Sequence, residues 1–366
     1  MADDTFQELK LELKKRSVQI HQYINTKVDQ MTIEPDDLSD AILDYLNYGG
    51  KMLRPGVLLF SCGAVGGDES TAIPAAAAIE FFHTWTLVHD DIIDQDDKRR
   101  GEDALHVKYY KRAAQNPLFN LTDEQAQHYG RSISILAGDT QHGMAISFLS
   151  DLFFENNVNS SVVLSLVREL DHNVLNTLVS GETLDVYYSK CPIETLTEQQ
   201  IMAMLWGKTG ALYEFAGRAG ALIGLNTADF DHKYVRALST FTSKCGLAFQ
   251  LLDDILGIVG DENKLGKPVG SDIREGKKTI VLYYALKNAN SSQKQKILKG
   301  LGHENLPDDE YSQIVELVQE LEGISETKKI ADAYLHEALE ALSIIPDSHH
   351  KTMLKSWADF MINRDY

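Results

Sequence analysis

The chain has 366 residues, of which 43% are hydrophobic and 24% are charged, a composition typical of globular rather than disordered proteins. Its 54 acidic residues outnumber its 35 basic residues, which gives a formal net charge of −19. This balance argues against nucleic acid as a partner, because phosphate backbones bind clustered lysine and arginine.

The expected location is the cytoplasm. Cys62, Cys191 and Cys245 are far apart and show no metal-ligand spacing, which favours a reducing compartment without disulfides. The sequence opens without the basic and then apolar layout of a signal peptide. No apolar stretch approaches the roughly 18 residues that cross a bilayer, so we expect no stable membrane insertion.

Helical periodicity runs along the chain, whereas the alternation typical of strands is scarce. Leu9 and Leu13 recur at helical spacing near the N-terminus, and Ile314 and Leu317 do so near the C-terminus. Glycine and proline turns separate these stretches, but no Gly/Ser-rich linker divides the sequence. We therefore expect an all-α protein of roughly a dozen helices, with a single domain over residues 1–366.

Two segments carry no obvious chemistry. Residues 111–127 are polar and end in a helix start at Thr122, with the capping-box spacing to Gln125. This segment is interpreted as a surface insertion between two core helices. Residues 291–366 are charged and amphipathic, which predicts packing or interface helices.

The most informative stretch is acidic. On a helix, Asp90 and Asp94 lie one turn apart on one face, and Asp91 lies about 100° around. Such stacked carboxylates repel by a few tenths of a kcal/mol, so we expect a cation to offset the repulsion. Arg99 and Arg100 follow, but they are expected to lie beyond the reach of the helix, next to a breaking glycine.

A second carboxylate pair, Asp253 and Asp254, lies inside another apolar helical run. Either pair alone is as compatible with a structural or solvated role as with a functional one, but two such pairs, each inside apolar sequence, favour a functional role. Carboxylate oxygens suit a hard cation such as Mg²⁺, which commonly bridges to substrate phosphates, and no Cys/His set for zinc is present. The natural hypothesis is a metal together with a diphosphate.

A diphosphate needs cations beyond the metal, and basic residues stand near glycines at several places. They are Lys51, Arg54, Lys208, Lys264, Lys267, Lys277 and Lys278. Each alone is more simply interpreted as a surface residue, and their joint occurrence is what points to diphosphate binding.

These residues belong to an ordered set of motifs. The set comprises Gly49-Gly-Lys-x-Leu-Arg-Pro55, His83, Asp90 to Asp94 with Arg99-Arg100-Gly101, Leu136-Ala-Gly-Asp139, Gly181-Glu-x-x-Asp185, Lys208-Thr209, Phe249-Gln-x-x-Asp-Asp254, and Gly266-Lys to Gly276-Lys-Lys-Thr279. Over almost its full length the chain resembles the trans-isoprenyl diphosphate synthases, the polyprenyl synthetase family. The resemblance implies the isoprenoid synthase fold, in which helices surround a deep central cavity and the two aspartate-rich helices face each other across its mouth.

The resemblance also implies roles for individual residues. About three Mg²⁺ ions, with Mn²⁺ as a substitute, are expected on Asp90, Asp94 and Asp253, supported by Asp91 and Asp254. The allylic diphosphate is expected on Arg99, Lys208, Thr209, Gln250, Lys267 and Lys277. Isopentenyl diphosphate is expected on Lys51, Arg54, His83 and Arg100.

His83 has the strongest competing interpretation, that of a core histidine. Its position seven residues before Asp90, two helical turns along the same face, favours the ligand role. The implied reaction is head-to-tail prenyl transfer by ionisation, condensation and elimination, without a protein nucleophile. The loop at 260–278 is a candidate for closing the site against water.

The second aspartate-rich motif departs from the family pattern. Many members have an aspartate four residues after Asp253, where this chain has Gly257. Glycine inside a helix costs about 1 kcal/mol relative to alanine, so its presence needs a reason. We expect one outer metal contact to be missing and catalysis to be retained.

Product length in this family depends on residues four and five positions before the first motif, here Thr86 and Trp85. One aromatic residue, one small residue and no insertion in the motif resemble the archaeal-type geranylgeranyl diphosphate synthases, which favours a C20 product. Phe82, one turn below Thr86, is an alternative floor for the growing chain. A C15 product follows if Phe82 and Trp85 both intrude, and a longer one if both turn aside.

Three other functions remain as alternatives. A class I terpene cyclase shares the ionisation chemistry but has no use for the pocket of Lys51, Arg54, His83 and Arg100. A metal-dependent phosphohydrolase at His89 lacks companion histidines. A non-catalytic synthase subunit is expected to have lost site residues that this chain keeps. The resemblance also suggests a homodimer.

Overall fold

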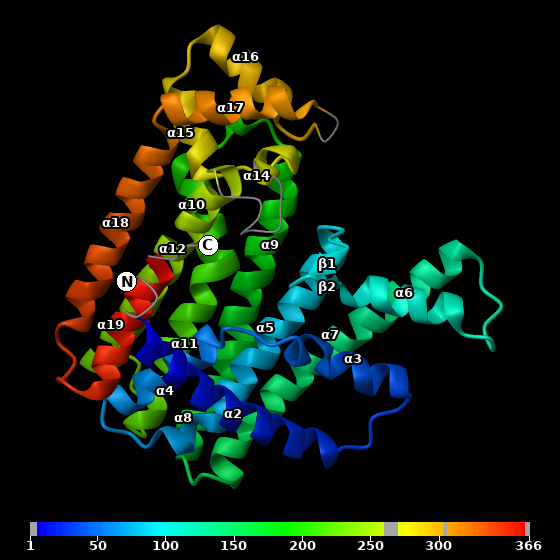
Figure 1. Cartoon of the computed structure of the whole chain (residues 1–366). Helices are drawn as coiled ribbons and strands as arrows, with labels where there is room; N and C mark the ends of the chain where they lie inside the picture. The colour runs from blue at the N-terminus through cyan, green and yellow to red at the C-terminus, as the bar shows by residue number, and fades with distance from the viewer. Residues whose placement is uncertain (1–5, 260–269, 304–305, 363–366) are drawn as a thin grey trace. The chain divides into compact units, whose positions relative to one another are not determined.

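The computed structural model describes residues 6–259, 270–303 and 306–362 (Figure 1). Nearly all regular structure in these ranges is helical, which confirms the predicted all-α class. The chain divides into two compact units, Met1–Val167 with Leu222–Ala228, and Arg168–Ala221 with Asp229–Tyr366. The expected single domain and central cavity stay predictions. None of the described helices is long and apolar enough to cross a membrane.

The first unit contains helices and one small hairpin. Its elements are α2 (Gln7–Asp29), α3 (Asp36–Asn47), α4 (Leu53–Ala64), η1 (Glu69–Ala72), α5 (Ile73–Ile93), β1 (Lys98–Arg99), β2 (Glu102–Asp103), α6 (Leu105–Gln115), α7 (Asp123–Phe154) and nearly all of α8 (Ser160–Arg168).

Helix α5 is the core of this unit. Pro74 stands in its first turn, where the missing backbone N–H costs nothing, and the alanines at 75–78 are fully buried. Helices α2, α4 and α7 pack against it. A helix that is apolar on all sides is expected to be buried in this way. Because α5 is held by this packing, the position of its C-terminal end, which carries the first aspartate-rich motif, is fixed as well.

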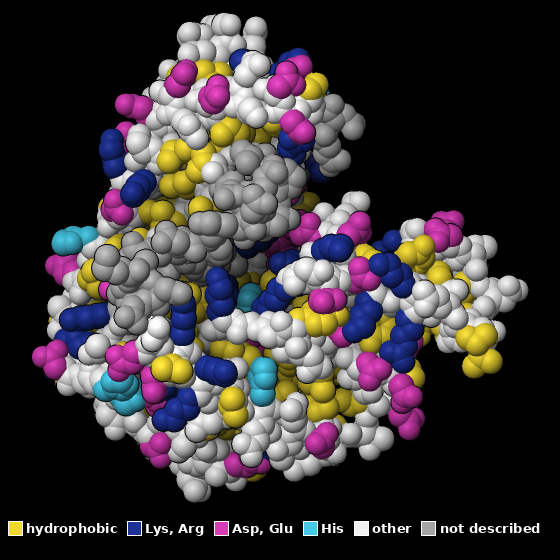
Figure 2. Space-filling model, in the orientation of Figure 1, with side chains coloured by type: hydrophobic (Ala, Val, Ile, Leu, Met, Phe, Trp, Pro, Cys, Tyr) yellow, Lys and Arg dark blue, Asp and Glu magenta, His cyan; other side chains and the backbone are white. Residues whose placement is uncertain are grey.

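Helices α6 and α7 form an antiparallel hairpin, whose end comprises the stretch 111–127. The predicted helix start is confirmed, because Thr122 and Gln125 form a capping box. Leu118 at the end of the hairpin is 89% exposed, and hydrophobic side chains are visible there at the right of Figure 2. The interpretation of this stretch as an insertion stays a prediction.

The second unit is also built of helices, and it has more of them than the first. They are η2 (Glu169–Val174), α9 (Leu175–Ser189), η3 (Ile193–Thr195), α10 (Glu198–Leu205), η4 (Trp206–Gly210), most of α11 (Ala211–Gly224), α12 (Lys233–Val259), α14 (Ser271–Arg274), α15 (Ile280–Asn288), α16 (Ser291–Gly300), α17 (Asp308–Glu320), α18 (Gly323–Leu342) and α19 (His349–Ile362).

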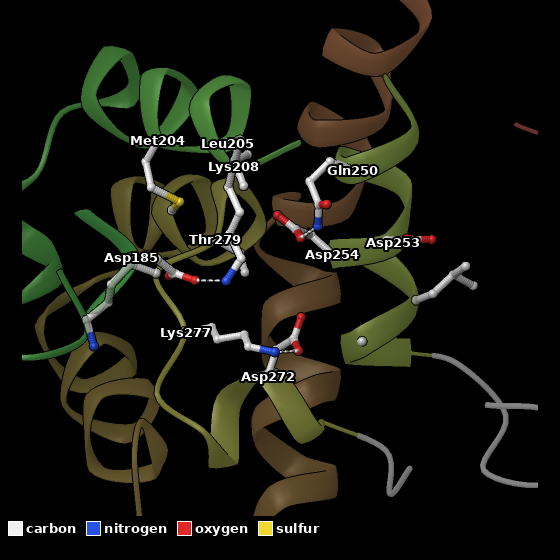
Figure 3. Close-up of a pocket in the computed structure, with 13 residues that line it drawn as sticks. Asp185, Met204, Leu205, Lys208, Gln250, Asp253, Asp254, Asp272, Lys277 and Thr279 are labelled. Carbon is white, nitrogen blue, oxygen red and sulfur yellow. Dashed lines mark hydrogen bonds and ion pairs between the residues drawn. The ribbon is translucent and has the colours of Figure 1, made fainter. Parts of the chain in front are cut away.

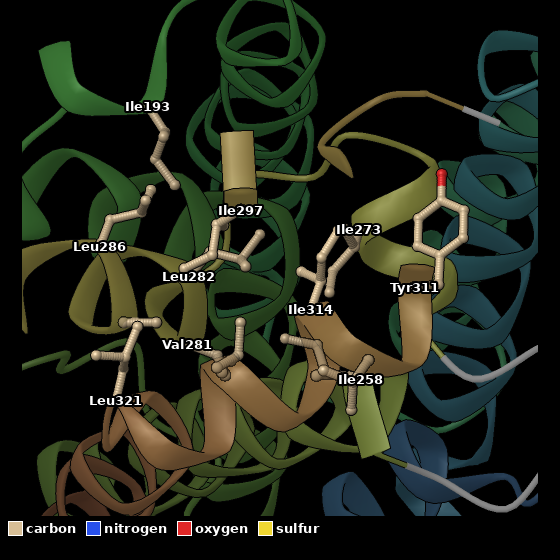
Figure 4. Close-up of a cluster of buried hydrophobic side chains, with 13 residues drawn as sticks. Ile193, Ile258, Ile273, Val281, Leu282, Leu286, Ile297, Tyr311, Ile314 and Leu321 are labelled. Carbon is tan, nitrogen blue, oxygen red and sulfur yellow. The ribbon is translucent and has the colours of Figure 1, made fainter. Parts of the chain in front are cut away.

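A buried hydrophobic cluster holds the end of α12 in place (Figure 4). Ile258 of α12, Ile273 of α14 and Val281 of α15 are fully buried in it, together with Ile314 and Tyr311 of α17. Burying side chains of this size contributes roughly 1.5–3 kcal/mol each. The cluster therefore fixes α14 against the last turns of α12, which carry the second aspartate-rich motif.

Candidate functional site

The first aspartate-rich motif lies at the C-terminal end of α5. Asp90 and Asp91 are in its last turn, and the Asp94 N–H donates to the Asp90 carbonyl at 2.7 Å. Asp91 is fully buried, whereas Asp90 is partly exposed and Asp94 is exposed. The helix thus presents two of its three carboxylates to solvent and turns the third inward.

Asp91 is held by a buried network. It accepts a hydrogen bond from the Tyr45 hydroxyl of α3 and forms an ion pair with Arg99 of β1. A second Arg99 nitrogen, Nε, donates to Asp91 at 3.2 Å, and the Tyr45 hydroxyl accepts from the Leu105 N–H at 2.9 Å. Asp91 therefore joins α3, α5, β1 and the start of α6.

The expectation that Arg99 lies beyond the reach of the helix is wrong. Strands β1 and β2 pair antiparallel through a tight turn in which Arg100 and Gly101 both have positive φ, +56° and +86°. Positive φ at both central residues is typical of a type I′ turn, which reverses the chain within two residues. The reversal returns Arg99 to the last turn of α5, where it offsets the charge of Asp91.

Three of the four residues predicted for isopentenyl diphosphate, namely Arg54, His83 and Arg100, lie together in the first unit. Arg54, in the first turn of α4, has its Nη1 3.0 Å from the Nε2 of His83 on α5. The Arg100 guanidinium packs on Gly50, where an added Cβ would lie 3.2 Å from Nη1. Lys51 follows Gly50 and is exposed. The guanidinium groups of Arg54 and Arg100 and the imidazole of His83 therefore lie close together.

His83 is electrically neutral in this group. Burial, and then the charges of Arg54, Arg100 and Arg99, hold its pKa well below 6.5. Because a guanidinium can only donate hydrogen bonds, Nε2 accepts from Arg54 and the ring proton is on Nδ1. His83 can therefore offer one N–H to a phosphate oxygen, but not a positive charge.

Glu80 is a site residue that the sequence analysis missed. It is 6% exposed, one helical turn before His83 on α5. Burial raises its pKa, while Arg100 and Arg54 act to lower it. The signal available in the sequence was its spacing of three from His83, which places both on one helix face.

In the second unit, Lys208 lies on η4, a π-helical turn that packs against α9. An added Cβ at Gly181 would lie 2.4 Å from the Lys208 backbone nitrogen, so glycine allows this approach. The Lys208 Nζ is 2.8 Å from Glu182 and 2.6 Å from Asp185. The Gly181-Glu-x-x-Asp motif, to which no role was given from sequence, thus holds the lysine.

Helix α12 continues the site through a chain of hydrogen bonds. The Thr209 hydroxyl donates to the Gln250 Oε1 at 2.9 Å, and the Gln250 Nε2 donates to the Asp254 Oδ1 at 3.0 Å. The other Asp254 oxygen, Oδ2, is buried and has no hydrogen-bond partner among the described residues. Burial, followed by the charges of Asp272 and Asp253, raises the Asp254 pKa well above its usual value.

Lys208, Gln250 and Asp254 line one cavity of about 370 Å³ within the second unit (Figure 3). Its lining is Asp185, Met204, Leu205, Lys208, Gln250, Asp253, Asp254, Leu256, Gly257, Asp272, Lys277, Lys278 and Thr279. Lys277 pairs with Glu275 at 2.7 Å and lies 3.5 Å from Asp272. The predicted ligand Lys267 lies outside the described residues, as do Lys264 and most of the loop proposed to close the site.

The predicted chain-length residues are packed against α7. Phe82 is fully buried, and the Trp85 ring lies 5.0 Å from the Phe82 ring and 5.2 Å from the His142 ring. Thr86 donates to the His83 carbonyl at 2.8 Å. Their role as a floor stays a prediction.

The residues present fit a divalent cation. Asp90 and Asp94 have the helical spacing of a carboxylate pair, and the Asp254 oxygen that lacks a partner among the described residues lies in a cavity with three further carboxylates. Oxygen donors of this kind suit Mg²⁺. Within the described ranges, no three acidic, histidine or cysteine side chains are already gathered as a complete metal site.

Comparison with known proteins identifies the family. The family model described as polyprenyl synthetase matches residues 35–318. The geranylgeranyl diphosphate synthase of Sulfolobus acidocaldarius is 34% identical, over 89% of this chain and 91% of the relative. The structure of geranylgeranyl pyrophosphate synthetase from Pyrococcus horikoshii matches with a TM-score of 0.82 and 32% identity, over 100% of this chain and 99% of the other.

A geranylgeranyl pyrophosphate synthase from Corynebacterium glutamicum, solved with isoprenyl diphosphate and magnesium, has a TM-score of 0.80 and 25% identity, over 98% of this chain and 99% of the other. The ordered motifs, the all-α fold and these full-length likenesses agree, and they show that the chain is a member of the polyprenyl synthetase family.

Proposed function

We propose that the protein is a Mg²⁺-dependent prenyltransferase that joins an allylic diphosphate head-to-tail to isopentenyl diphosphate and releases geranylgeranyl diphosphate (C20). One observation carries the proposal: the cavity of the second unit combines carboxylates, among them a buried Asp254 oxygen with no partner in the part of the chain that the structure describes, with Lys208 and Lys277. Carboxylates can hold metal ions, and these ions and the lysines together balance the negative charge of a diphosphate.

Different residues are proposed to bind the metal ions and each of the two diphosphates. Asp90, Asp94 and Asp253 are proposed to hold the metal ions, supported by Asp91 and Asp254. Lys208, Thr209, Gln250, Lys277, Arg99 and Lys267 are proposed to bind the allylic diphosphate. When bound, Mg²⁺ supplies positive charge that stabilises the departing diphosphate.

The second diphosphate is proposed to bind without metal, to Lys51, Arg54 and Arg100, with the Nδ1–H of neutral His83 as a further donor. Arginine suits this task because its guanidinium contacts two phosphate oxygens at once. The allylic C–O bond then ionises, the double bond of isopentenyl diphosphate attacks the carbocation, and a proton is lost to the leaving diphosphate. No protein nucleophile is required.

The C20 product is supported by the named relatives, two of which are geranylgeranyl synthases from archaea. The packing of Trp85 and Phe82 on α7 is compatible with a floor for the growing chain. We also propose that the protein is a cytoplasmic homodimer; sedimentation of the purified protein tests the dimer, and fractionation of cells tests the location.

A product-length assay tests the function. The protein is given Mg²⁺, labelled isopentenyl diphosphate and, in separate reactions, C5, C10 or C15 allylic diphosphates. We expect a C20 product that needs both substrates and disappears when EDTA removes the metal. Absence of condensation with every allylic substrate, from a folded protein, contradicts the proposal and favours a cyclase or a non-catalytic subunit.

A further inference from the structure

The loop that joins α6 to α7 carries apolar side chains on its surface. Leu118 is 89% exposed, Leu121 is 40% exposed and Phe119 is 38% exposed. Residues 113–122 contain no charged side chain, although 24% of the residues in the whole chain are charged. Single exposed apolar residues are common, but a group of them in one loop indicates a contact surface. Residues 116–122 are called the hairpin tip below.

Local contacts hold the hairpin tip in this arrangement. The Asn116 side chain accepts a hydrogen bond from the Leu118 N–H at 3.0 Å, and the Asn116 carbonyl accepts one from the Phe119 N–H at 3.0 Å. The Phe119 ring lies 5.3 Å from the Tyr129 ring of α7. Phe119 thus packs against the hairpin itself, while the turn presents Leu118 to solvent as a fixed apolar projection.

The shape of the hairpin tip restricts the kind of partner that it fits. Within the first unit the end of the hairpin extends away from α5, and hydrophobic side chains stand out on it (Figures 1 and 2). Peptides and helices bind in grooves or along sheet edges, which a convex end does not offer. A lipid surface fits a convex apolar end, because the bilayer surrounds the side chains that enter it.

The charges near the hairpin tip decide which lipid surface fits. The cations that precede it, Lys111 and Arg112, are paired within the protein, Lys111 with Asp103 at 2.6 Å and Arg112 with Asp37 at 2.8 Å. Helix α7 begins with two acids directly after the tip, and the chain has a net charge of −19. An anionic surface repels such a chain. Apolar contact must therefore supply the binding, which favours a lipid without net charge.

We propose that the hairpin tip docks the protein reversibly on a phosphatidylcholine-like lipid surface, with Leu118 and Leu121 entering the boundary of the acyl chains. A lipid partner follows from the proposed function, on which this inference rests, because the apolar tail of a C20 product favours a bilayer over water. Docking places the protein at the surface that takes up its product. Such docking is peripheral, and none of the described helices is suited to cross the bilayer.

Two matched variants test the docking. Leu118→Asn replaces the apolar side chain of the tip by a polar one of similar size. Leu11→Asn is the control, because Leu11 on α2 is also exposed, by 65%, but lies outside the tip. Exposed positions of this kind tolerate substitution, so both variants are expected to fold, which circular dichroism checks.

The readout is sedimentation of the protein with phosphatidylcholine vesicles in the absence of substrates. The parent and Leu11→Asn are expected to bind alike, and Leu118→Asn about 10-fold more weakly, the effect of withdrawing one leucine side chain from an apolar medium. Addition of phosphatidylserine is expected not to strengthen binding. In Leu118→Trp, lipids with brominated acyl chains are expected to quench the added tryptophan, whereas in Leu11→Trp they are not.

The inference is overturned if the parent binds no phosphatidylcholine vesicles, if it needs phosphatidylserine to bind, or if Leu118→Asn binds as the parent does. It also fails if Leu118→Asn lowers the oligomeric state, because the tip is then a contact between copies of the chain. The product assay separates the two hypotheses. A parent that makes product without binding vesicles refutes the docking alone, and one that binds vesicles without condensing substrates refutes the proposed function.

Discussion

At the scale of single residues, His83 makes the stability of the first unit depend on pH. Its pKa is held well below 6.5 by burial and by Arg54, Arg100 and Arg99, whereas in the unfolded chain it is near 6.5. Below pH 6.5 the His83 side chain binds a proton in the unfolded chain but not in the folded protein. The free energy of unfolding therefore falls as pH decreases from about 6.5 towards the folded-state pKa.

We expect His83→Gln to reduce this pH dependence, because glutamine does not titrate. Urea unfolding at pH 7.5 and pH 5.5 measures it: the parent protein is expected to lose more stability between the two values than His83→Gln. The exposed His128 provides the control, since His128→Gln leaves the buried imidazole in place. Equal losses in the parent and in His83→Gln contradict the assignment of a neutral, buried His83.

Lys51 and Lys208 test the division between two diphosphates. Lys51 is exposed and precedes α4 in the first unit, and Lys208 is held between Glu182 and Asp185 in the second unit. A lost charge-assisted hydrogen bond costs about 1.5–3 kcal/mol, or roughly 10- to 100-fold in binding. We expect Lys51→Ala to raise the KM for isopentenyl diphosphate by this factor, and Lys208→Ala that for the allylic diphosphate.

The measurement is steady-state kinetics in which each substrate is varied at saturating levels of the other. Each variant serves as the control of the other. A change of similar size in both KM values for Lys51→Ala contradicts two separate pockets.

At the scale of elements, the β1–β2 hairpin is fixed to α5 by one buried ion pair. Removing the charge of Asp91 leaves Arg99, with a side chain 28% exposed, facing a weaker acceptor. Breaking a fully buried pair costs about 3–5 kcal/mol, and partial exposure of Arg99 reduces the effect, so we expect Asp91→Asn to lower the free energy of unfolding by about 2 kcal/mol. The exposed Asp97 in the same acidic segment is the control, with a change within about 0.5 kcal/mol for Asp97→Asn.

Chemical denaturation of both variants without added metal gives this comparison. An Asp91→Asn variant as stable as Asp97→Asn means that the network around Asp91 does not hold the hairpin.

The contact between α9 and η4 depends on Gly181. Its added Cβ would meet backbone atoms, the Lys208 nitrogen at 2.4 Å and the Gly207 carbonyl carbon at 2.6 Å, which cannot rotate away. We expect Gly181→Ala to destabilise the protein by about 1–3 kcal/mol, the usual cost of overpacking. Gly143→Ala is the opposite control: Gly143 is exposed in α7 with no atom within 4 Å of the added Cβ, so alanine is expected to stabilise by about 0.5–1 kcal/mol.

Thermal unfolding of the two variants under identical conditions decides the point. If Gly181→Ala and Gly143→Ala shift the melting temperature in the same direction, the close approach of α9 and η4 is contradicted.

At the scale of the whole molecule, the sequence predicted what depends on helical periodicity. The all-α class and the single face of Asp90 and Asp94 follow from spacing along one helix, so they needed no tertiary information. The full set of motifs then indicated the family, which the comparisons confirm.

Contacts between different elements could not be predicted in the same way. Arg99 reaches Asp91 through strands of two residues each, too short to show a periodic pattern. Gly257 was visible as a missing carboxylate, but nothing in the sequence placed Asp272 in its space. The neutral state of His83 likewise depends on burial and on arginines from separate segments.

Helix α5 has a consequence for how this protein tolerates change. It carries Glu80, His83 and Asp90 on one uninterrupted helix. The geometry of the helix therefore fixes the distance between the groups proposed for the two substrates. His83 and Asp90 are seven residues apart, or about 10.5 Å along the axis at 1.5 Å per residue. One residue inserted between them would turn one group about 100° away from the other, whereas substitutions keep the spacing. An insertion between these positions is therefore expected to disrupt the site, whereas exchanges of side chains leave the spacing intact.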